Sequence, residues 1–191
     1  MKKIAALLFL SAVFAAPVFA AAADDEGIYV GVDVGSAHAK NPTSDVGQVT
    51  SSISPTTGVL IGYQFDKYWG FEGQYTSAGE MDTVNGANTT KIKSETYTLD
   101  FVLSYPVSDA FSLYGKAGYG YNTTTVESTT ANYVGMERDL KTYGLGGQFK
   151  VFSSMGIRLG WDSYFAAFGD TSGNVYKYNI DVYSLAAIFK F

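Results

Sequence analysis

Apolar and aromatic side chains occupy every second position in about eight segments of the chain. In one of them, Leu99, Phe101 and Leu103 alternate with Asp100 and Val102. A period of two is the pattern of a β-strand whose two faces meet different surroundings. The segments are residues 28–35, 58–65, 69–75, 97–105, 111–121, 143–151, 157–162 and 183–191. The pattern predicts an all-β protein.

The lengths of the connections indicate which face of these strands points outward. Short connections are predicted at 66–68, 106–110 and 152–154, and they alternate with long ones at 36–57, 77–92, 122–138 and 166–175. This alternation is typical of short periplasmic turns and long extracellular loops in an outer-membrane barrel. Because a backbone in lipid must satisfy its own hydrogen bonds, such a sheet has to close on itself. We therefore predict a transmembrane antiparallel up-and-down β-barrel of about eight strands, with its apolar face toward lipid.

The first residues of the chain have the pattern of a secretory signal peptide. Lys2 and Lys3 precede the apolar run 4–14, which is shorter than the roughly 20 residues of a membrane-spanning helix. Small residues follow, so cleavage is predicted between Ala20 and Ala23. The expected division is a signal peptide at 1–20 and an outer-membrane β-barrel domain at 21–191, exported through the inner membrane to the bacterial outer membrane.

Composition narrows the classes of partner. The chain has 15 Tyr, 13 Phe and 21 Gly, which suits an aromatic-rich sheet, and it has no cysteine for disulfides or metal thiolates. Its formal net charge of −5, without a basic cluster, argues against a nucleic-acid partner. No cofactor is expected.

Three stretches carry a resemblance to a known family. They are GIYVGV at 27–32, GVLIGYQFDKYWGFEGQY at 58–75 and YSLAAIFKF at 183–191. The sequence resembles the small outer-membrane barrel family that includes OmpX and the transmembrane domain of OmpA. The resemblance implies that the terminal strand, with Tyr183, Phe189 and Phe191, is the signal read by the barrel assembly machinery, with periplasmic chaperones acting earlier. The same three residues would also face lipid.

The face opposite the apolar one contains charged residues that need partners inside a barrel. They are Asp33, Glu72, Asp100, Lys116, Lys150, Arg158 and Asp162. We predict a buried charge network of Glu72, Asp100, Lys116, Arg158 and Asp162, with Asp100 and Lys116 at similar heights. The family resemblance supports a structural plug; the alternative is a gate that passes small solutes when ion pairs exchange.

His38 is the single histidine, and it lies near Ser36 and Asp45. A Ser-His-carboxylate site needs a base that packed neighbours orient, which a polar loop does not supply. With one histidine and no cysteine, a metal site would need oxygen ligands alone, and no calcium-loop spacing is present. We therefore expect no catalytic, cofactor-binding or metal-binding residues.

The function that this pattern favours is a non-enzymatic, monomeric outer-membrane barrel with a structural or surface-interaction role. Its expected surroundings are outer-membrane lipid and lipopolysaccharide. The Ser-, Thr- and Asn-rich loops would either bind an extracellular ligand or form a hydrophilic cover of the cell surface without a dedicated ligand. One alternative is a narrow porin-like channel for small or hydrophobic solutes, similar to OmpW. A more distant alternative is a lipid A-modifying outer-membrane enzyme.

Overall fold

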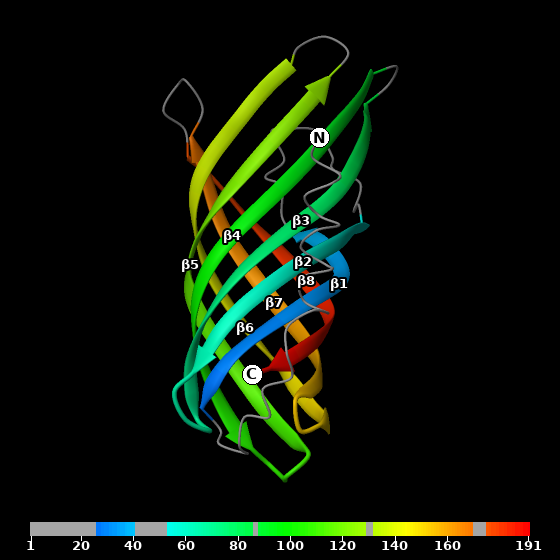
Figure 1. Cartoon of the computed structure of the whole chain (residues 1–191). Helices are drawn as coiled ribbons and strands as arrows, with labels where there is room; N and C mark the ends of the chain where they lie inside the picture. The colour runs from blue at the N-terminus through cyan, green and yellow to red at the C-terminus, as the bar shows by residue number, and fades with distance from the viewer. Residues whose placement is uncertain (1–25, 41–52, 86–87, 129–131, 170–174) are drawn as a thin grey trace.

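Eight antiparallel strands close into one barrel in the computed structural model (Figure 1). The structure describes residues 26–40, 53–85, 88–128, 132–169 and 175–191. The strands are β1 (Gly27–Lys40), β2 (Ile53–Gln64), β3 (Trp69–Asn85), β4 (Asn88–Pro106), β5 (Phe111–Ser128), β6 (Asn132–Phe152), β7 (Met155–Gly169) and β8 (Val175–Lys190). Each strand pairs with its neighbours in sequence, and β1 pairs with β8. This confirms the predicted up-and-down topology. The predicted signal peptide lies outside the described residues.

The barrel carries its apolar side chains on the outside. Leu99 and Leu145 are 63% and 57% exposed, whereas Glu72 and Asp100 are 0% exposed. Along β2, exposed and buried positions alternate without a break as far as Tyr63. A water-soluble sheet protein would have the opposite arrangement, so the lipid-facing orientation predicted from the sequence is confirmed.

No helix among the described residues is long and apolar enough to cross a membrane.

Aromatic side chains gather near both ends of the outer wall. Near the short turns, Phe65 stacks on Trp69 with ring centroids 4.3 Å apart, and Phe111 meets Phe149 at 4.5 Å. Toward the opposite end, pairs include Tyr75 and Tyr97 at 4.9 Å, and Tyr143 and Phe165 at 5.0 Å. Such belts are typical of the two membrane interfaces of a barrel.

The turns at one end are as short as predicted. Asp66 closes the first of them, because its Oδ1 accepts hydrogen bonds from the backbone N–H groups of Tyr68 at 2.7 Å and Trp69 at 3.0 Å. In the second, Ser108 Oγ accepts from the Phe111 N–H at 3.1 Å. These side chains satisfy backbone donors that no neighbouring strand reaches.

At the opposite end, the strands extend farther than the sequence pattern predicted. Residues 77–92 and 122–138, which were expected to be loops, are largely paired strand. β3 and β4 stay paired as far as Asn85 and Asn88, and β5 and β6 as far as Glu127 and Asn132. Thr-rich segments still form the backbone hydrogen bonds of a β-sheet. The alternation of apolar and polar residues disappears there, because neither face of the sheet needs to be apolar.

Glycine allows strands to come close inside the barrel. A Cβ atom on Gly118 would lie 2.1 Å from the backbone oxygen of Leu99, so the two strands would have to separate. Gly115 lies three residues earlier on the same strand, and a Cβ there would meet nothing closer than the Gly144 oxygen at 3.8 Å. The two positions form a natural comparison.

We predict that Gly118→Ala lowers the free energy of unfolding by about 2 kcal/mol, because overpacking strains the β4–β5 pairing. Gly115→Ala should change it by less than about 0.5 kcal/mol. Urea unfolding of the refolded protein in detergent micelles measures both. Equal stability of the two variants would show that the interior tolerates the added methyl group.

Candidate functional site: a charged layer inside the barrel

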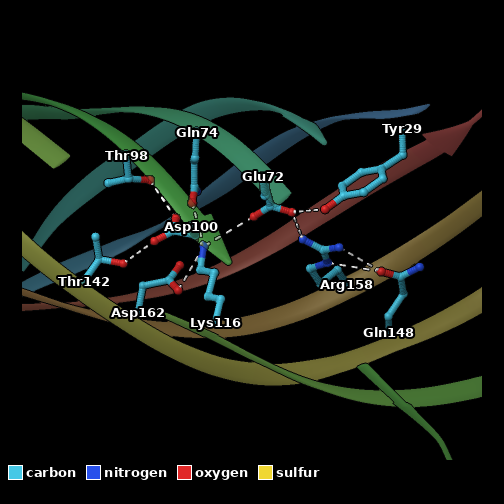
Figure 2. A network of polar contacts seen from close by, with 10 residues as sticks. All are labelled: Tyr29, Glu72, Gln74, Thr98, Asp100, Lys116, Thr142, Gln148, Arg158 and Asp162. Carbon is cyan, nitrogen blue, oxygen red and sulfur yellow. Dashed lines mark hydrogen bonds and ion pairs between the residues drawn. The ribbon is translucent and has the colours of Figure 1, made fainter. Parts of the chain in front are cut away.

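The structure brings together all five residues of the predicted network (Figure 2). Glu72 lies on β3, Asp100 on β4 and Lys116 on β5, and both Arg158 and Asp162 lie on β7. All five are buried, none being more than 7% exposed. β3, β4 and β5 are neighbours in the closed barrel, and β7 lies across the interior from β3.

Glu72 is the point where the two cations meet. Its Oε1 lies 3.5 Å from Lys116 Nζ, and its Oε2 forms an ion pair with Arg158 Nη1. The Tyr29 hydroxyl donates a hydrogen bond to Oε2 at 2.9 Å. Glu72 is also the cross-strand partner of Asp100, and opposed like charges destabilise a sheet unless a cation lies close.

Lys116 supplies that cation. Its Nζ lies 3.1 Å from Asp162 Oδ1 and 4.0 Å from Asp100 Oδ2, and it donates a hydrogen bond to Gln74 Oε1 at 2.7 Å. Gly144 is paired with both Lys116 and Asp162. Because it has no side chain, the lysine stem and the carboxylate can meet over it: a Cβ there would lie 2.0 Å from Asp162 Oδ1.

Two threonines complete the surroundings of Asp100. Thr98 Oγ1 donates to its Oδ2 at 2.8 Å, and Thr142 Oγ1 donates to its Oδ1 at 2.7 Å. The carboxylate therefore depends on hydroxyl donors more than on Lys116, which lies at the limit of an ion pair. Hydrogen bonds to a buried charge offset the cost of removing it from water.

Arg158 is held between two tyrosine rings. Its guanidinium carbon lies 4.7 Å from the ring centre of Tyr114 and 5.5 Å from that of Tyr29. Nε and Nη2 both donate to Gln148 Oε1 at 3.1 Å. The planar cation is therefore bound along its faces and its edge, which gives it one orientation.

Sequence reasoning missed the neutral partners in this layer. They are Tyr29, Gln74, Thr98, Tyr114, Thr142 and Gln148. All of them occupy interior positions in the same period of two that located the charges. The pattern showed that these residues lie on the interior face of the sheet. Their positions along the barrel axis, relative to the charged residues, depend on the register between strands.

Apolar residues lie on either side of the charged layer. Toward the short turns, a buried cluster consists of Tyr29, Leu60, Ala186 and Ile188. Toward the other end, a second cluster consists of Ala37, Leu140, Tyr164 and Val182, with Ile180 packed against it. The interior is therefore filled by side chains from the first cluster through the charged layer to the second, as an eight-stranded barrel allows.

Lys150 does not join the network, although its position in the period of two predicted an interior side chain. It is exposed. Lys150 lies at the end of β6, where the register with β7 shifts between Lys150 and Phe152. β6 is still paired with β7 at this point, Lys150 with Gly156, but this is the short-turn end of the strand, and the lysine side chain is exposed there.

The possible Ser-His site lies on the outer wall. Ser36 Oγ and His38 Nε2 are 3.4 Å apart, and the His38 ring meets Tyr183 edge-on at 5.6 Å. Asp45, the carboxylate considered with them, lies outside the described residues. Within the described part of the chain no carboxylate hydrogen-bonds to His38, and no group of three or more His, Cys, Asp or Glu side chains is placed to hold a metal ion.

The three terminal aromatic residues lie on the final strand and just after it. Tyr183 is 51% exposed and Phe191 is 37% exposed, and Phe189 is paired with Val30. The Phe191 N–H donates to the Ile28 oxygen at 2.9 Å, which fixes the end of the chain to β1. Their role as an assembly signal stays a prediction.

An antiparallel eight-stranded barrel with an apolar outer wall and a charged interior is a small integral membrane barrel of the bacterial outer-membrane type. The chain belongs to the Outer membrane protein beta-barrel domain family, whose model matches residues 5–191.

Two relatives match parts of this chain. Outer membrane protein A of Yersinia pseudotuberculosis serotype I (strain IP32953) is 32% identical over 124 residues, covering 62% of this chain and 34% of that protein. Outer membrane protein A of Serratia marcescens is 34% identical over 61 residues, covering 32% of this chain and 17% of the relative. This chain therefore matches about a third or less of their length.

Solved structures share the fold at low sequence identity. Neisserial surface protein A superimposes with a TM-score of 0.69 at 17% identity, covering 86% of this chain and 97% of the other. Ail, the attachment invasion locus protein of Yersinia pestis, gives a TM-score of 0.60 at 17% identity, covering 87% and 99%. Both similarities support the barrel architecture.

We predict that Lys116→Met lowers the free energy of unfolding by about 3–5 kcal/mol, because it leaves Glu72 and Asp162 without their shared cation. Lys67→Met is a matched control: Lys67 is exposed with its Nζ 5.0 Å above the Tyr68 ring, and its loss should cost at most about 1 kcal/mol. Chemical unfolding in micelles compares the two. Similar losses would mean that the buried lysine stabilises nothing specific.

Proposed function

We propose that this protein is a non-enzymatic, non-conducting outer-membrane barrel that presents a protruding sheet, formed by the outer parts of β3–β6, to ligands outside the cell. The observation that carries this proposal is the unequal length of the strands. The β2–β3 pairing ends at Thr56 and Ala78, whereas β3 and β4 stay paired to Asn85 and Asn88. In Figure 1, β3 to β6 rise past the ends of β1 and β2.

The protruding sheet has two edges. Residues 79–85 of β3 and 132–139 of β6 have no pairing strand on their outer side among the residues that the structure describes. An unpaired edge presents backbone N–H and C=O groups to any extended segment that approaches it. The expected ligand is therefore a protein segment that adds a strand to this sheet.

A related structure supports a role at the surface. The structural relative Ail is named for attachment and invasion, and one of its structures holds the heparin analogue sucrose octasulfate. The present chain has a formal net charge of −5, which disfavours a polyanionic ligand. We therefore propose a protein ligand in place of a sulfated one.

The filled interior argues against the alternative of a solute channel. The charged layer lies between two apolar clusters, and any passage would require both to open. The Ser36 and His38 pair likewise gives little support to an enzyme, because a hydroxyl and an imidazole 3.4 Å apart still need an orienting group.

The expected partners during assembly and in the membrane remain proposals. The outward aromatic residues Tyr183, Phe189 and Phe191 end the last strand, where assembly machinery would meet an incomplete barrel. Outer-membrane lipid and lipopolysaccharide would surround the apolar wall. A monomer suffices for this arrangement, because the barrel closes within one chain.

The refolded mature protein should show no reproducible conductance steps in a planar lipid bilayer. Lys116→Ala should remain silent as well, because the apolar clusters on both sides of the charged layer are unchanged. A large open porin inserted in the same bilayer is the positive control. Reproducible small steps that Lys116→Ala enlarges would contradict the closed interior and favour the channel.

Removal of the β3–β4 half of the protruding sheet, with the unpaired edge of β3, should abolish surface binding while leaving the barrel folded. The variant replaces residues 79–93 with Asn-Gly, which joins the paired residues Ala78 and Ser94 through a tight hairpin. Retention of cells displaying it on a surface coated with serum proteins should fall to the level of cells without the protein.

The matched control for this variant substitutes Asn-Gly for Asp109-Ala110 at the short-turn end, where retention should not change. Heat-dependent gel mobility establishes that both variants fold. If the shortened variant is retained as well as the parent, the β3–β4 half of the protruding sheet is not the binding surface.

A further inference from the structure

Ser36 and His38 are polar side chains on a wall that otherwise faces lipid. They lie on β1 in the same phase as the exposed residues Val32 and Val34. Ser36 Oγ and His38 Nε2 are 3.4 Å apart, and neither side chain forms another side-chain hydrogen bond among the described residues. A hydroxyl and an imidazole with unused donors and acceptors are costly beside lipid, so a further polar partner is expected there.

The pair lies at the level of the aromatic belt that is farther from the short turns. Ser36 is paired with Tyr183, and the His38 ring meets Tyr183 edge-on at 5.6 Å. Tyr183 is paired in turn with Trp161, whose ring centre lies 5.6 Å from that of Tyr143 in the belt. A polar group at this level of a barrel wall meets lipid headgroups.

A shallow hollow in the outer wall begins at this belt and extends toward the short turns. It has a volume of about 590 Å³ and crosses β1, β8, β7 and β6. Ser36, Tyr183 and Trp161 line its end at the belt. Its aliphatic lining, in the next outward row toward the short turns, includes Val34, Leu185 and Leu159. The hollow therefore has a polar, aromatic end and an aliphatic end.

The described lining of the hollow contains no charged side chain. Asp181, the cross-strand partner of His38, is 1% exposed and accepts a hydrogen bond from Ser163 at 2.8 Å, so its carboxylate lies beneath the surface. A phosphate or ammonium headgroup thus finds no exposed counter-charge in this lining. A hydroxyl, in contrast, can both donate to and accept from Ser36 and His38.

We propose that this hollow binds one membrane lipid with a neutral, hydroxylated headgroup such as a sugar. The acyl chain lies along the aliphatic end, where the wall is hollowed. The headgroup hydroxyls exchange hydrogen bonds with Ser36 and His38, which gives both side chains the polar partner that they lack in the wall itself. Trp161 and Tyr183 supply amphipathic rings beside the headgroup, as aromatic residues do at membrane interfaces.

The two tryptophans of the chain make this proposal testable. Trp161 lines the hollow, whereas Trp69 stacks on Phe65 near the short turns. Trp69→Phe and Trp161→Phe therefore leave one fluorescent reporter each. Each refolded variant is placed in phosphatidylcholine vesicles that contain a lipid with brominated chains, which quench a tryptophan that they contact. The brominated lipid is either glucosyl-diacylglycerol or phosphatidylcholine with the same chains.

Trp161 should be half-quenched at about a tenfold lower fraction of the brominated glucosyl lipid than of brominated phosphatidylcholine, which is the effect of one or two net hydrogen bonds. Phosphatidylcholine is the suitable comparison because its headgroup has no hydrogen-bond donor. Trp69 should be quenched equally by the two lipids, because it lies away from the hollow.

Two substitutions in the Trp69→Phe protein test the polar end of the hollow. Ser36→Ala and His38→Phe should each reduce the preference for the glucosyl lipid to about threefold or less, because each removes hydrogen-bonding groups. His38→Phe keeps an aromatic ring beside Tyr183. If one of the two variants fails to fold, the other decides.

The matched control is Tyr97→Phe, which removes a hydroxyl from the outer wall beside Tyr75, outside the hollow. It should keep the full preference for the glucosyl lipid. Equal quenching of Trp161 by the two lipids would overturn the proposal. The same preference at Trp69, or an unchanged preference in Ser36→Ala or His38→Phe, would overturn it as well.

Discussion

The shared carboxylate of Glu72 is the interaction on which the interior depends. It accepts a hydrogen bond from Tyr29 and forms ion pairs with Lys116 on one side and Arg158 on the other. Through Lys116 it is connected to Asp162. A single buried group therefore ties β1, β3, β5 and β7 across the barrel, between strands that do not pair directly with one another.

This arrangement follows from the lipid around the barrel. The outer wall must be apolar, so polar and charged side chains occupy the inside, where each needs a partner. Glycines such as Gly144 make room for long side chains to meet over the backbone. The same demand explains the short distances around Asp100, whose two oxygens accept from Thr98 and Thr142. Because the interior is closed, the protruding strands are the candidate binding surface.

Much of the fold could be predicted from the sequence, because the alternation of apolar and polar residues along each strand shows which face meets lipid. It located eight strands, the short turns and the interior face of residues such as Glu72 and Arg158. The period of two failed at Lys150, which has the interior phase but is exposed at the short-turn end of β6. It also ended the strands too early at 77–92, since no apolar face marks a strand beyond the membrane.

The period of two could not predict where each side chain lies along the barrel axis, because that position depends on the register between neighbouring strands. Asp100 and Lys116 were expected at similar heights, and they lie two residues apart in register, because Lys116 is paired with Val102. The sequence did not show that Asp162, 3.1 Å from the same lysine, lies closer to it than Asp100 does, at 4.0 Å. Neutral partners such as Gln74 and Tyr114 carry no signal beyond their face. Their roles emerge only when the barrel closes and places β3, β5 and β7 around one interior.

The most direct test of this account is a double-mutant cycle between Glu72 and Arg158, measured as free energies of unfolding in micelles for Glu72→Gln, Arg158→Leu and the double variant. If the shared carboxylate organises the interior, the two losses are strongly non-additive, with a coupling energy of about 2 kcal/mol or more. Additive losses would contradict it, and would mean that the two side chains fill space in the barrel without depending on each other.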